Sequence, residues 1–119
     1  TVTEYNPGVE IHFQSRSTEQ RIPSNYEVSI FRLVQECVTN AMKHGKCKDI
    51  WVKLEWLNNA VNVVVKDEGV GFDQKVVKDH SFGILGMRER IEILNGTISI
   101  ESEINRGTTV LFKIPLEVE

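Results

Sequence analysis

Four polar side chains lie at helical spacing in one stretch of the chain, and their types are those that handle ions. They are Glu36, Asn40, Lys43 and His44, at positions i, i+4, i+7 and i+8. In an α-helix this spacing gathers them on one side, while the apolar residues of the same stretch turn toward a core. An Asn oxygen can enter an octahedral Mg²⁺ shell that waters and phosphate oxygens complete, and a Lys ammonium can meet phosphate charge. Glu36, one turn earlier, is suited to orient a hydroxyl, an imidazole or a water. A polar helix face taken alone is more often simply solvated, so this interpretation needs support elsewhere in the chain.

That support comes from Asp67, which follows an alternating apolar stretch and opens the run DEGVGF at residues 67–72. An ionised carboxylate only accepts hydrogen bonds, so it suits the exocyclic amino group of adenine and opposes the carbonyl that guanine carries at that position. Gly69 and Gly71 permit a flat ligand to approach the backbone closely. An Asp in a glycine turn is common without any ligand. Beside the polar helix face, however, it predicts an ATP site in which one wall holds metal and the other reads adenine.

Glycines mark two further positions. Gly83 and Gly86 open a second predicted helix, where unpaired backbone donors and the helix dipole favour phosphate. Without a ligand, the same glycines indicate only a flexible turn. Gly107 precedes Thr108 just before the last predicted strand. Two familiar nucleotide motifs are absent, because residues 69–71 lack the third glycine of a dinucleotide fingerprint and residues 45–47 lack the upstream glycine and the Ser or Thr of a P-loop.

The elements that must position these residues alternate between strands and helices. Alternating apolar residues at 9–13 predict a half-buried strand, followed by a loop over 15–21. A capping box at 24–27 predicts a helix that ends at Gly45 as its C-cap. The predicted apolar stripe of this helix consists of Val28, Phe31, Leu33, Val34, Cys37, Val38, Ala41 and Met42.

The second half of the chain predicts two hairpins and a helix. Residues 50–56 and 61–65 alternate around a turn at 58–59, which delivers Asp67 to the end of the second strand. Residues 84–94 predict a helix that closes at 95–96, and a second strand pair at 98–100 and 110–114 turns at 105–107. The fold class predicted is α+β, an α/β sandwich in which helices cover one face of a mixed, mostly antiparallel sheet, because each amphipathic element needs one covered side.

Length and composition predict a single domain over residues 1–119. The chain is 40% hydrophobic and 26% charged, and its net charge of -3 offers no basic field for nucleic acid. Cys37 and Cys47 are too few for a disulfide framework or a zinc site and favour a reducing cytoplasm. No apolar stretch is long enough to span a bilayer, so the domain itself is expected to make no membrane contact. Thr1 at the first position suggests a fragment of a larger protein, which can carry membrane segments.

This ordered set of motifs resembles the ATP-binding and catalytic domain of a bacterial two-component sensor histidine kinase, within the gyrase, Hsp90, histidine kinase and MutL superfamily. The resemblance runs nearly end to end. Residues 36–44 resemble the family's N box, and residues 67–72, 82–87 and 107–109 resemble its three glycine boxes. It implies a Bergerat-type ATP-binding fold with ATP and Mg²⁺ as cofactors. No separate F box is present, and GILGMRER at 83–90 is similar to the DegS, LiaS and VraS type, whose partner regulators are similar to NarL and LuxR proteins.

The resemblance also implies roles for the matching positions. Glu36 would position the attacking group, Asn40 would bind Mg²⁺, Asp67 would read adenine, and Thr108 would support adenine through water. Lys43 and His44 would border the phosphates. Gly69, Gly71, Gly83 and Gly86 would shape the nucleotide pocket and its lid. The segment 72–83 is short, polar and bounded by glycines, so we expect it to be disordered without ATP and ordered by nucleotide.

One component of a histidine kinase is missing. Such kinases phosphorylate a histidine on a helical hairpin upstream of this domain, and none of His12, His44 and His80 has that setting. We therefore expect the chain to hold the ATP machinery and to act on a dimerisation and phosphoacceptor domain of the same kinase, which then phosphorylates a response regulator. Two alternatives stay open, an anti-sigma factor serine kinase and a nucleotide-binding interaction module without transfer activity. An acceptor-histidine hairpin upstream of Thr1 would distinguish the first reading from both.

Overall fold

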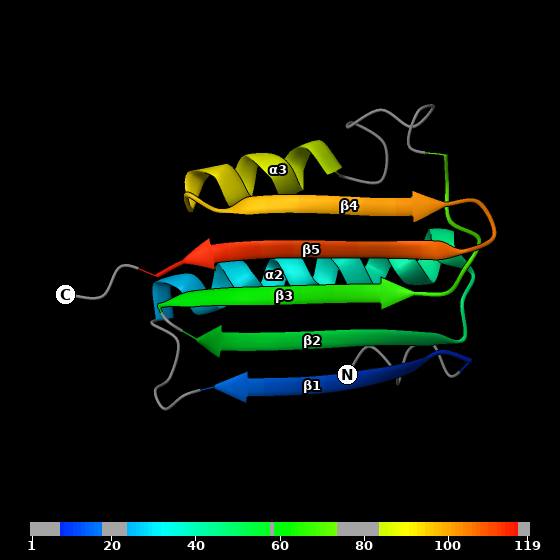
Figure 1. Cartoon of the computed structure of the whole chain (residues 1–119), viewed down its shortest axis with the longest axis horizontal. Coiled ribbons are helices and arrows are strands. Elements are labelled where there is room, and N and C mark those ends of the chain that lie inside the picture. Colours follow the sequence, from blue (N-terminus) through cyan, green and yellow to red (C-terminus); the bar gives the residue numbers. More distant parts are fainter. Residues whose placement is uncertain (1–7, 18–23, 58, 74–83, 117–119) are drawn as a thin grey trace.

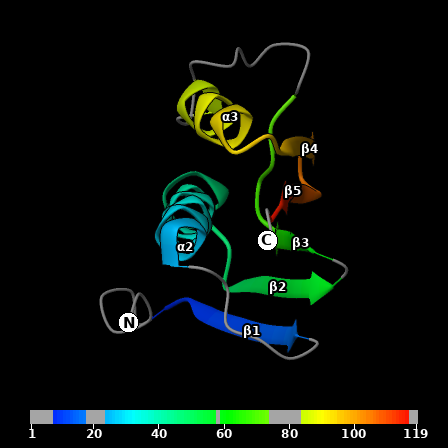
Figure 2. The same ribbon diagram turned by 90° about the vertical axis from the view of Figure 1, so that its left-hand side faces the viewer.

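The computed structural model of the chain describes residues 8–17, 24–57, 59–73 and 84–116. Five strands form one sheet in the order β1-β2-β3-β5-β4, in which β1 runs parallel to β2 and all other neighbours are antiparallel. Both α-helices lie on the same face of this sheet (Figures 1 and 2). The predicted α+β class, with a mixed and mostly antiparallel sheet covered on one face, is confirmed. In chain order the elements are β1 (Glu10–Ser17), α2 (Ser24–Asn40), the π-helical turn η1 (Ala41–Gly45), β2 (Asp49–Leu57), β3 (Ala60–Asp67), α3 (Ile84–Ile93), β4 (Thr97–Glu103) and β5 (Gly107–Pro115).

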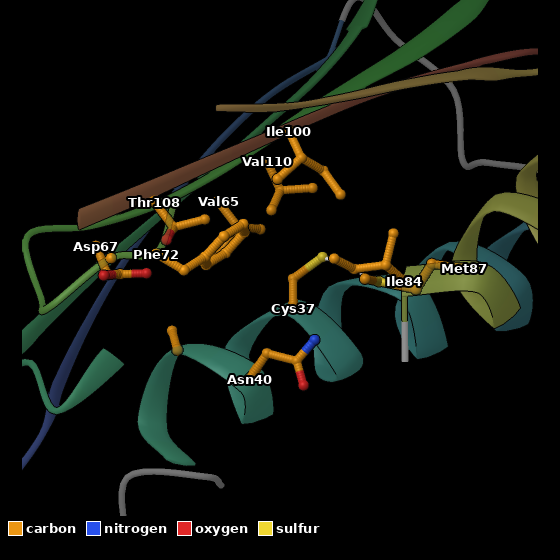
Figure 3. A pocket seen from close by; sticks show the side chains of 12 residues that line it. Cys37, Asn40, Val65, Asp67, Phe72, Ile84, Met87, Ile100, Thr108 and Val110 are labelled. Atoms are coloured by element: carbon orange, nitrogen blue, oxygen red, sulfur yellow. Dashed lines mark hydrogen bonds between the residues drawn. The ribbon is translucent and has the colours of Figure 1, made fainter. Parts of the chain in front are cut away.

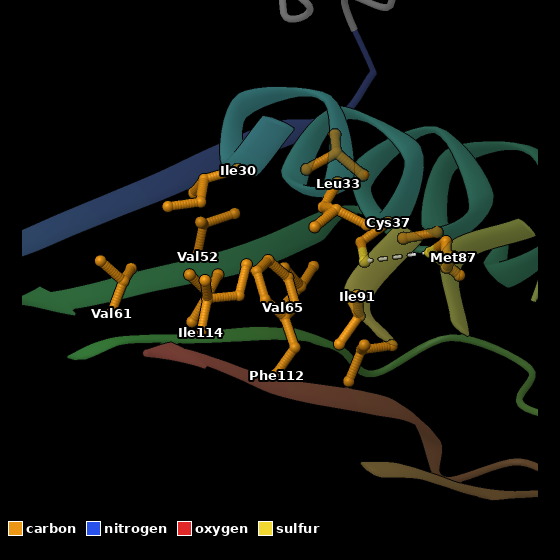
Figure 4. Close-up of a cluster of buried hydrophobic side chains, with 14 of the residues drawn as sticks. Ile30, Leu33, Cys37, Val52, Val61, Val65, Met87, Ile91, Phe112 and Ile114 are labelled. Carbon is orange, nitrogen blue, oxygen red and sulfur yellow. Dashed lines mark hydrogen bonds between the residues drawn. The ribbon is translucent and has the colours of Figure 1, made fainter. Parts of the chain in front are cut away.

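The core fills the space between the sheet and the two helices (Figure 4). Every second residue of β3 is buried, and Phe112 on β5, Leu33 on α2 and Ile91 on α3 are fully buried against that face. Burying one such side chain contributes about 1.5–3 kcal/mol to the free energy of unfolding. The core therefore fixes the end of β3, and Asp67 with it, on the face of the sheet that the helices cover.

The buried face of α2 differs from the predicted stripe. Ile30, Leu33 and Cys37 are buried, whereas Val28 is 57% exposed and Phe31 is 66% exposed. The prediction included the last two residues and omitted Ile30, so it was wrong at the start of the helix. Positions i, i+3 and i+7 counted from Ile30 lie on one face, and only that face meets the sheet. The apolar residues at 28 and 31 satisfy a helical spacing but turn away from the core.

The first strand is longer than predicted. Ser15 and Ser17 pair with Leu54 and Trp56 of β2, so the loop expected over 15–21 was wrong for residues 15–17. Strand pairing uses the backbone, and it continues here although the side chains no longer alternate. Phe13 is 62% exposed, and not half-buried as expected. β1 is an edge strand of the sheet, and the apolar face is covered less well there than at β3.

The end of the first helix also differs from the prediction. After Asn40 the chain makes the π-helical turn η1, and Lys46 takes the left-handed backbone conformation with φ 51°. Gly45, predicted to be the C-cap, instead lies inside this turn. A π turn holds more residues than an α turn. The spacing that placed Lys43 and His44 on the same side as Glu36 therefore no longer applies beyond Asn40.

The predicted turns are confirmed where the structure describes them. Asn59, Asn95 and Asn105 adopt left-handed backbone conformations at the three connections, as Asn tolerates better than most residues. At the end of α3 the N–H of Gly96 donates to the carbonyl of Ile91 at 2.9 Å, which closes the helix in a Schellman motif. No helix within the described ranges is long and apolar enough to cross a membrane.

Candidate functional site

A pocket lies where the last turn of α2, the first turn of α3 and one end of the sheet meet (Figure 3). It is open to solvent at its mouth, and with that solvent included its empty space is about 560 Å³. Most of its walls are apolar, and three polar side chains enter it, so a flat ligand held by a few polar contacts fits best. The lining residues are Cys37, Asn40, Ala41, Val65, Asp67, Gly71, Phe72, Ile84, Met87, Ile100, Thr108 and Val110.

Asp67 is the buried acid of this pocket, with only 5% of its surface exposed. Burial raises the pKa of its carboxyl, and hydrogen bonds from the backbone N–H groups of Gly69 and Thr108 oppose that rise without cancelling it. The N–H of Gly69 donates to Oδ1 at 2.9 Å. An ionised carboxylate has about four acceptor positions. Two backbone donors leave acceptor capacity for a ligand, which suits an amino group.

The strand register places Asp67 at one end of a polar row across the sheet. Asp67 of β3 pairs with Thr108 of β5, and Thr108 pairs with Ser102 of β4. The Ser102 and Thr108 hydroxyl oxygens are 2.7 Å apart. The sequence-based prediction missed Ser102. Its alternation with Ile98 and Ile100 was the available signal, because it puts Ser102 on the face of β4 that these residues share.

Two glycines allow the segment after β3 to pack against the β4–β5 turn. Gly71 has φ 61° and Gly107 has φ 93°, both in the left-handed region. A Cβ on Gly71 would collide with the carbonyl oxygen of Glu103, and a Cβ on Gly107 would collide with the carbonyl oxygen of Asp67. The contact is completed by a hydrogen bond of 2.7 Å from the N–H of Asn105 to the carbonyl of Val70. Backbone therefore touches backbone directly behind the acid.

Of the polar residues predicted on one helix side, Glu36, Asn40 and Lys43 have side chains that the structure describes, and of these three Asn40 lines the pocket. It closes α2 and faces the pocket from the wall opposite Asp67 (Figure 3). Glu36 is half-buried one turn earlier, and Lys43 is exposed within η1. The side chain of His44 lies outside the described part of the structure. An amide oxygen at this wall is a suitable Mg²⁺ ligand when phosphate oxygens and waters supply the other positions.

The second predicted glycine pair is described only in part. Gly86 lies in the first turn of α3, exposed, with open space where a Cβ would be, while its neighbours Ile84 and Met87 line the pocket. Gly83 and His80 fall outside the described residues, as does the part 74–83 of the segment 72–83 for which a nucleotide-ordered lid was predicted. Gly69 is half-buried and contributes its N–H to Asp67.

Sulfur atoms join the two helices at the floor of the pocket. The Cys37 thiol donates to the Met87 sulfur at 3.7 Å (Figure 4). Burial raises the pKa of Cys37 to about 12, and the nearby Glu36 carboxylate adds to that rise. The thiol is therefore neutral at pH 7 and behaves as a small apolar side chain.

The comparison with known proteins finds the same family that the sequence motifs resemble. Residues 25–118 match the family of histidine kinase-, DNA gyrase B- and HSP90-like ATPases. The histidine-protein kinase/phosphatase DegS of Bacillus subtilis is 45% identical over 99% of this chain and 32% of its own length. The oxygen sensor histidine kinase NreB of Staphylococcus carnosus is 36% identical over 95% of this chain and 33% of its own length. The chain thus spans about a third of these relatives.

Solved structures agree on the fold. The histidine kinase domain of the blue-light activated histidine kinase of Erythrobacter litoralis has a TM-score of 0.75 and 19% identity, covering 97% of this chain and 56% of that one. The histidine kinase AdeS of Acinetobacter baumannii has a TM-score of 0.75 and 15% identity, covering 98% of this chain and 60% of that one. The resemblance found from the motifs is confirmed: the chain belongs to the family of histidine kinase-, DNA gyrase B- and HSP90-like ATPases, among which its named relatives are histidine kinases.

Proposed function

We propose that this chain, as a single domain over residues 1–119, is the ATP-binding catalytic domain of a larger sensor histidine kinase. It binds Mg²⁺-ATP and supplies the γ-phosphate to a histidine on the dimerisation domain of the same kinase. The observation that carries this proposal is that the buried Asp67 and Asn40 line one mostly apolar pocket, from its sheet side and its helix side. The identity of 45% to DegS adds weight to it.

The sheet side of the pocket selects the base. Adenine lies between apolar walls, and its amino group donates to the remaining acceptor positions of Asp67. A hydrogen bond to a charged group contributes about 1.5–3 kcal/mol. Guanine presents a carbonyl oxygen at that point, where it would face the carboxylate with no hydrogen between the two acceptors. The pocket therefore accepts ATP and rejects GTP.

The helix side handles the phosphates. Asn40 supplies the fixed protein oxygen of the Mg²⁺ shell, and the metal, when bound, neutralises phosphate charge. Glu36, one turn earlier, orients the attacking group. Lys43 and His44 border the phosphates, and Gly83 and Gly86 let the start of α3 approach them.

The remaining parts of the proposal concern the whole kinase. Its dimerisation domain presents the acceptor histidine, and the phosphoryl group then passes to a response regulator of the NarL and LuxR type. The domain works in the cytoplasm, whether or not the parent protein is anchored in a membrane. The motifs at residues 83–90 and the relatives DegS and NreB support this assignment.

The test is phosphoryl transfer from ATP radiolabelled at the γ-phosphate. The chain alone should bind ATP yet incorporate no stable label, because the sequence gives none of its histidines the helical-hairpin setting of an acceptor. Adding the histidine-bearing hairpin of the parent kinase should restore a label that is acid-labile and alkali-stable. Glu36→Gln should slow this transfer more than it weakens binding. Acid-stable label, or label on the isolated chain, would contradict the proposal in favour of serine transfer.

Asn40→Ala should remove the Mg²⁺-dependent part of nucleotide binding, because the metal shell loses its fixed protein oxygen. We expect an affinity loss of about tenfold in Mg²⁺ and little loss in EDTA, on the scale of one hydrogen bond to a charged group. Titrating the variant with a non-hydrolysable ATP analogue in both buffers measures the difference. Thr39→Ala, one position earlier on α2, is the matched control. An Asn40 variant that keeps the full metal-dependent difference would make this residue structural.

A further inference from the structure

Ser102 connects three segments that surround the sheet side of the pocket. Its Oγ accepts a hydrogen bond from the N–H of Phe72 at 2.9 Å. The same oxygen lies 3.1 Å from the carbonyl oxygen of Gly107 and 2.7 Å from the hydroxyl oxygen of Thr108. Phe72 and Thr108 both line the pocket, whereas Ser102 is behind them. The serine therefore contacts the pocket walls and not the space within them.

The hydrogen-bonding capacity of a hydroxyl selects one arrangement of these contacts. A hydroxyl has one proton to donate and two lone pairs to accept with. Gly107 offers only a carbonyl oxygen here, so Ser102 must donate its proton to Gly107 if that contact is to be a hydrogen bond. Ser102 also accepts from the N–H of Phe72, and with its proton on Gly107 it can meet the Thr108 hydroxyl only as an acceptor. The directions of these three contacts then agree with one another, and the Thr108 hydroxyl points its proton away from the pocket.

This arrangement has a consequence for the polar row of Asp67, Thr108 and Ser102. With its proton committed to Ser102, the Thr108 hydroxyl presents only lone pairs to the pocket. Asp67 presents only lone pairs as well when it is ionised. The row then forms a surface of acceptors, which favours a ligand or a bridging water that donates and disfavours a base edge that accepts.

We propose that Ser102 is a positioning residue for adenine recognition, which holds the Thr108 hydroxyl as an acceptor and anchors the backbone at Phe72. This inference rests on the proposed function and deepens it. Without the Ser102 hydroxyl, Thr108 is free to turn its proton into the pocket, and selectivity for a base with an amino group declines. Overall affinity declines too, because the N–H of Phe72 loses its acceptor.

The test compares two nucleotides on the full chain by calorimetric titration. One is a non-hydrolysable ATP analogue, and the other is the matching purine riboside triphosphate, which lacks the amino group. For Ser102→Ala we expect the affinity for the ATP analogue to fall about five- to tenfold and the affinity for the purine analogue to fall less. The ratio of the two affinities should therefore decrease. Ser102→Thr, which keeps the hydroxyl, should retain the wild-type ratio.

Two controls isolate the route through Thr108. Ser99→Ala removes an exposed serine from the opposite face of the same strand and should change neither affinity. In a Thr108→Val background, Ser102→Ala should leave the affinity ratio unchanged, because no hydroxyl remains to be oriented. Ser102→Cys, which keeps the size and has a weak donor and acceptor, serves as a second variant if Ser102→Ala does not fold.

The outcomes separate this inference from the function it rests on. If a folded Ser102 variant lost the same factor of affinity for both nucleotides, the role of Ser102 would be structural only and the inference would be overturned. The inference would also be overturned if Ser102→Ala lowered the ratio of the two nucleotide affinities as far in the Thr108→Val background as in the wild type. If the wild-type chain binds neither nucleotide, the proposed function itself fails. A wild type that binds and prefers the amino-bearing base leaves that function standing whatever the variants do.

Discussion

Replacing Asp67 with asparagine is expected to lower the affinity for ATP by roughly 10- to 150-fold while the fold survives. The estimate corresponds to the 1.5–3 kcal/mol of a hydrogen bond to a charged group. An asparagine keeps one acceptor for the N–H of Gly69 but presents an amino group of its own toward the adenine edge. Titration with a non-hydrolysable ATP analogue measures the change. Asp49→Asn is the matched control, because Asp49 contacts His12 on the edge pair of strands at 2.8 Å and lies outside the pocket.

The stability of the Asp67→Asn variant distinguishes loss of recognition from loss of structure. The pKa of Asp67 is higher in the folded chain than its ordinary value of 3.8, so the folded state binds this proton more tightly than the unfolded state. Its contribution to stability is fully present below pH 3.8 and is lost as the pH rises through the folded pKa. At pH 7 the buried carboxylate therefore weakens the ligand-free fold. We expect the free energy of unfolding of the variant to lie within about 1 kcal/mol of the wild-type value, or above it.

The same pKa shift predicts how ATP binding depends on pH. Binding needs the ionised carboxylate, and the raised pKa brings protonation to a higher pH than for an exposed aspartate. ATP affinity should therefore weaken as the pH falls through this pKa, and the Asp67→Asn variant should lack that part of the dependence. Unchanged affinity in a folded variant would remove Asp67 from base recognition.

Gly107→Ala is expected to reduce the free energy of unfolding by about 2–5 kcal/mol. The left-handed backbone costs an alanine roughly 1–2 kcal/mol, and overpacking adds about 1–3 kcal/mol. The added methyl meets the backbone of Asp67 and the Cα of Glu68, neither of which can rotate away like a side chain. Displacing that backbone also moves the acid, so nucleotide affinity should fall together with stability.

Chemical denaturation monitored by tryptophan fluorescence measures this loss. Gly86→Ala is the matched control, because Gly86 is helical and has open space around the new methyl group. An alanine there should stabilise the ligand-free chain by up to about 1 kcal/mol. A Gly107 variant as stable as the Gly86 variant would contradict the close packing behind Asp67.

The sequence predicted the parts of the fold and site that depend on local periodicity. Strict alternation in β3 leads directly to Asp67 at the strand end, and the helical spacing of α2 brings Asn40 to the pocket wall. The error at Val28 and Phe31 has a physical cause. An apolar-rich helix offers more than one acceptable stripe, and the sheet decides which one is buried.

Other features depend on contacts between distant segments. Ser102 reaches Phe72 across 30 residues of sequence, and no local pattern marks that hydrogen bond. The length of β1 follows from backbone pairing with β2, which does not need alternating side chains. The π-helical turn η1 changes the helical phase after Asn40, so α-helical spacing alone does not determine where Lys43 lies.

The buried thiol at the floor of the pocket has a consequence for covalent chemistry. Electrophiles and peroxides react with thiolates, and a pKa of about 12 keeps the Cys37 thiol protonated at pH 7. The Glu36 carboxylate contributes to this protection by its charge. Alkylating nucleotide analogues should therefore leave Cys37 unmodified even when they occupy the pocket beside it. Oxidants that inactivate enzymes with reactive cysteines should likewise spare the thiol of this site.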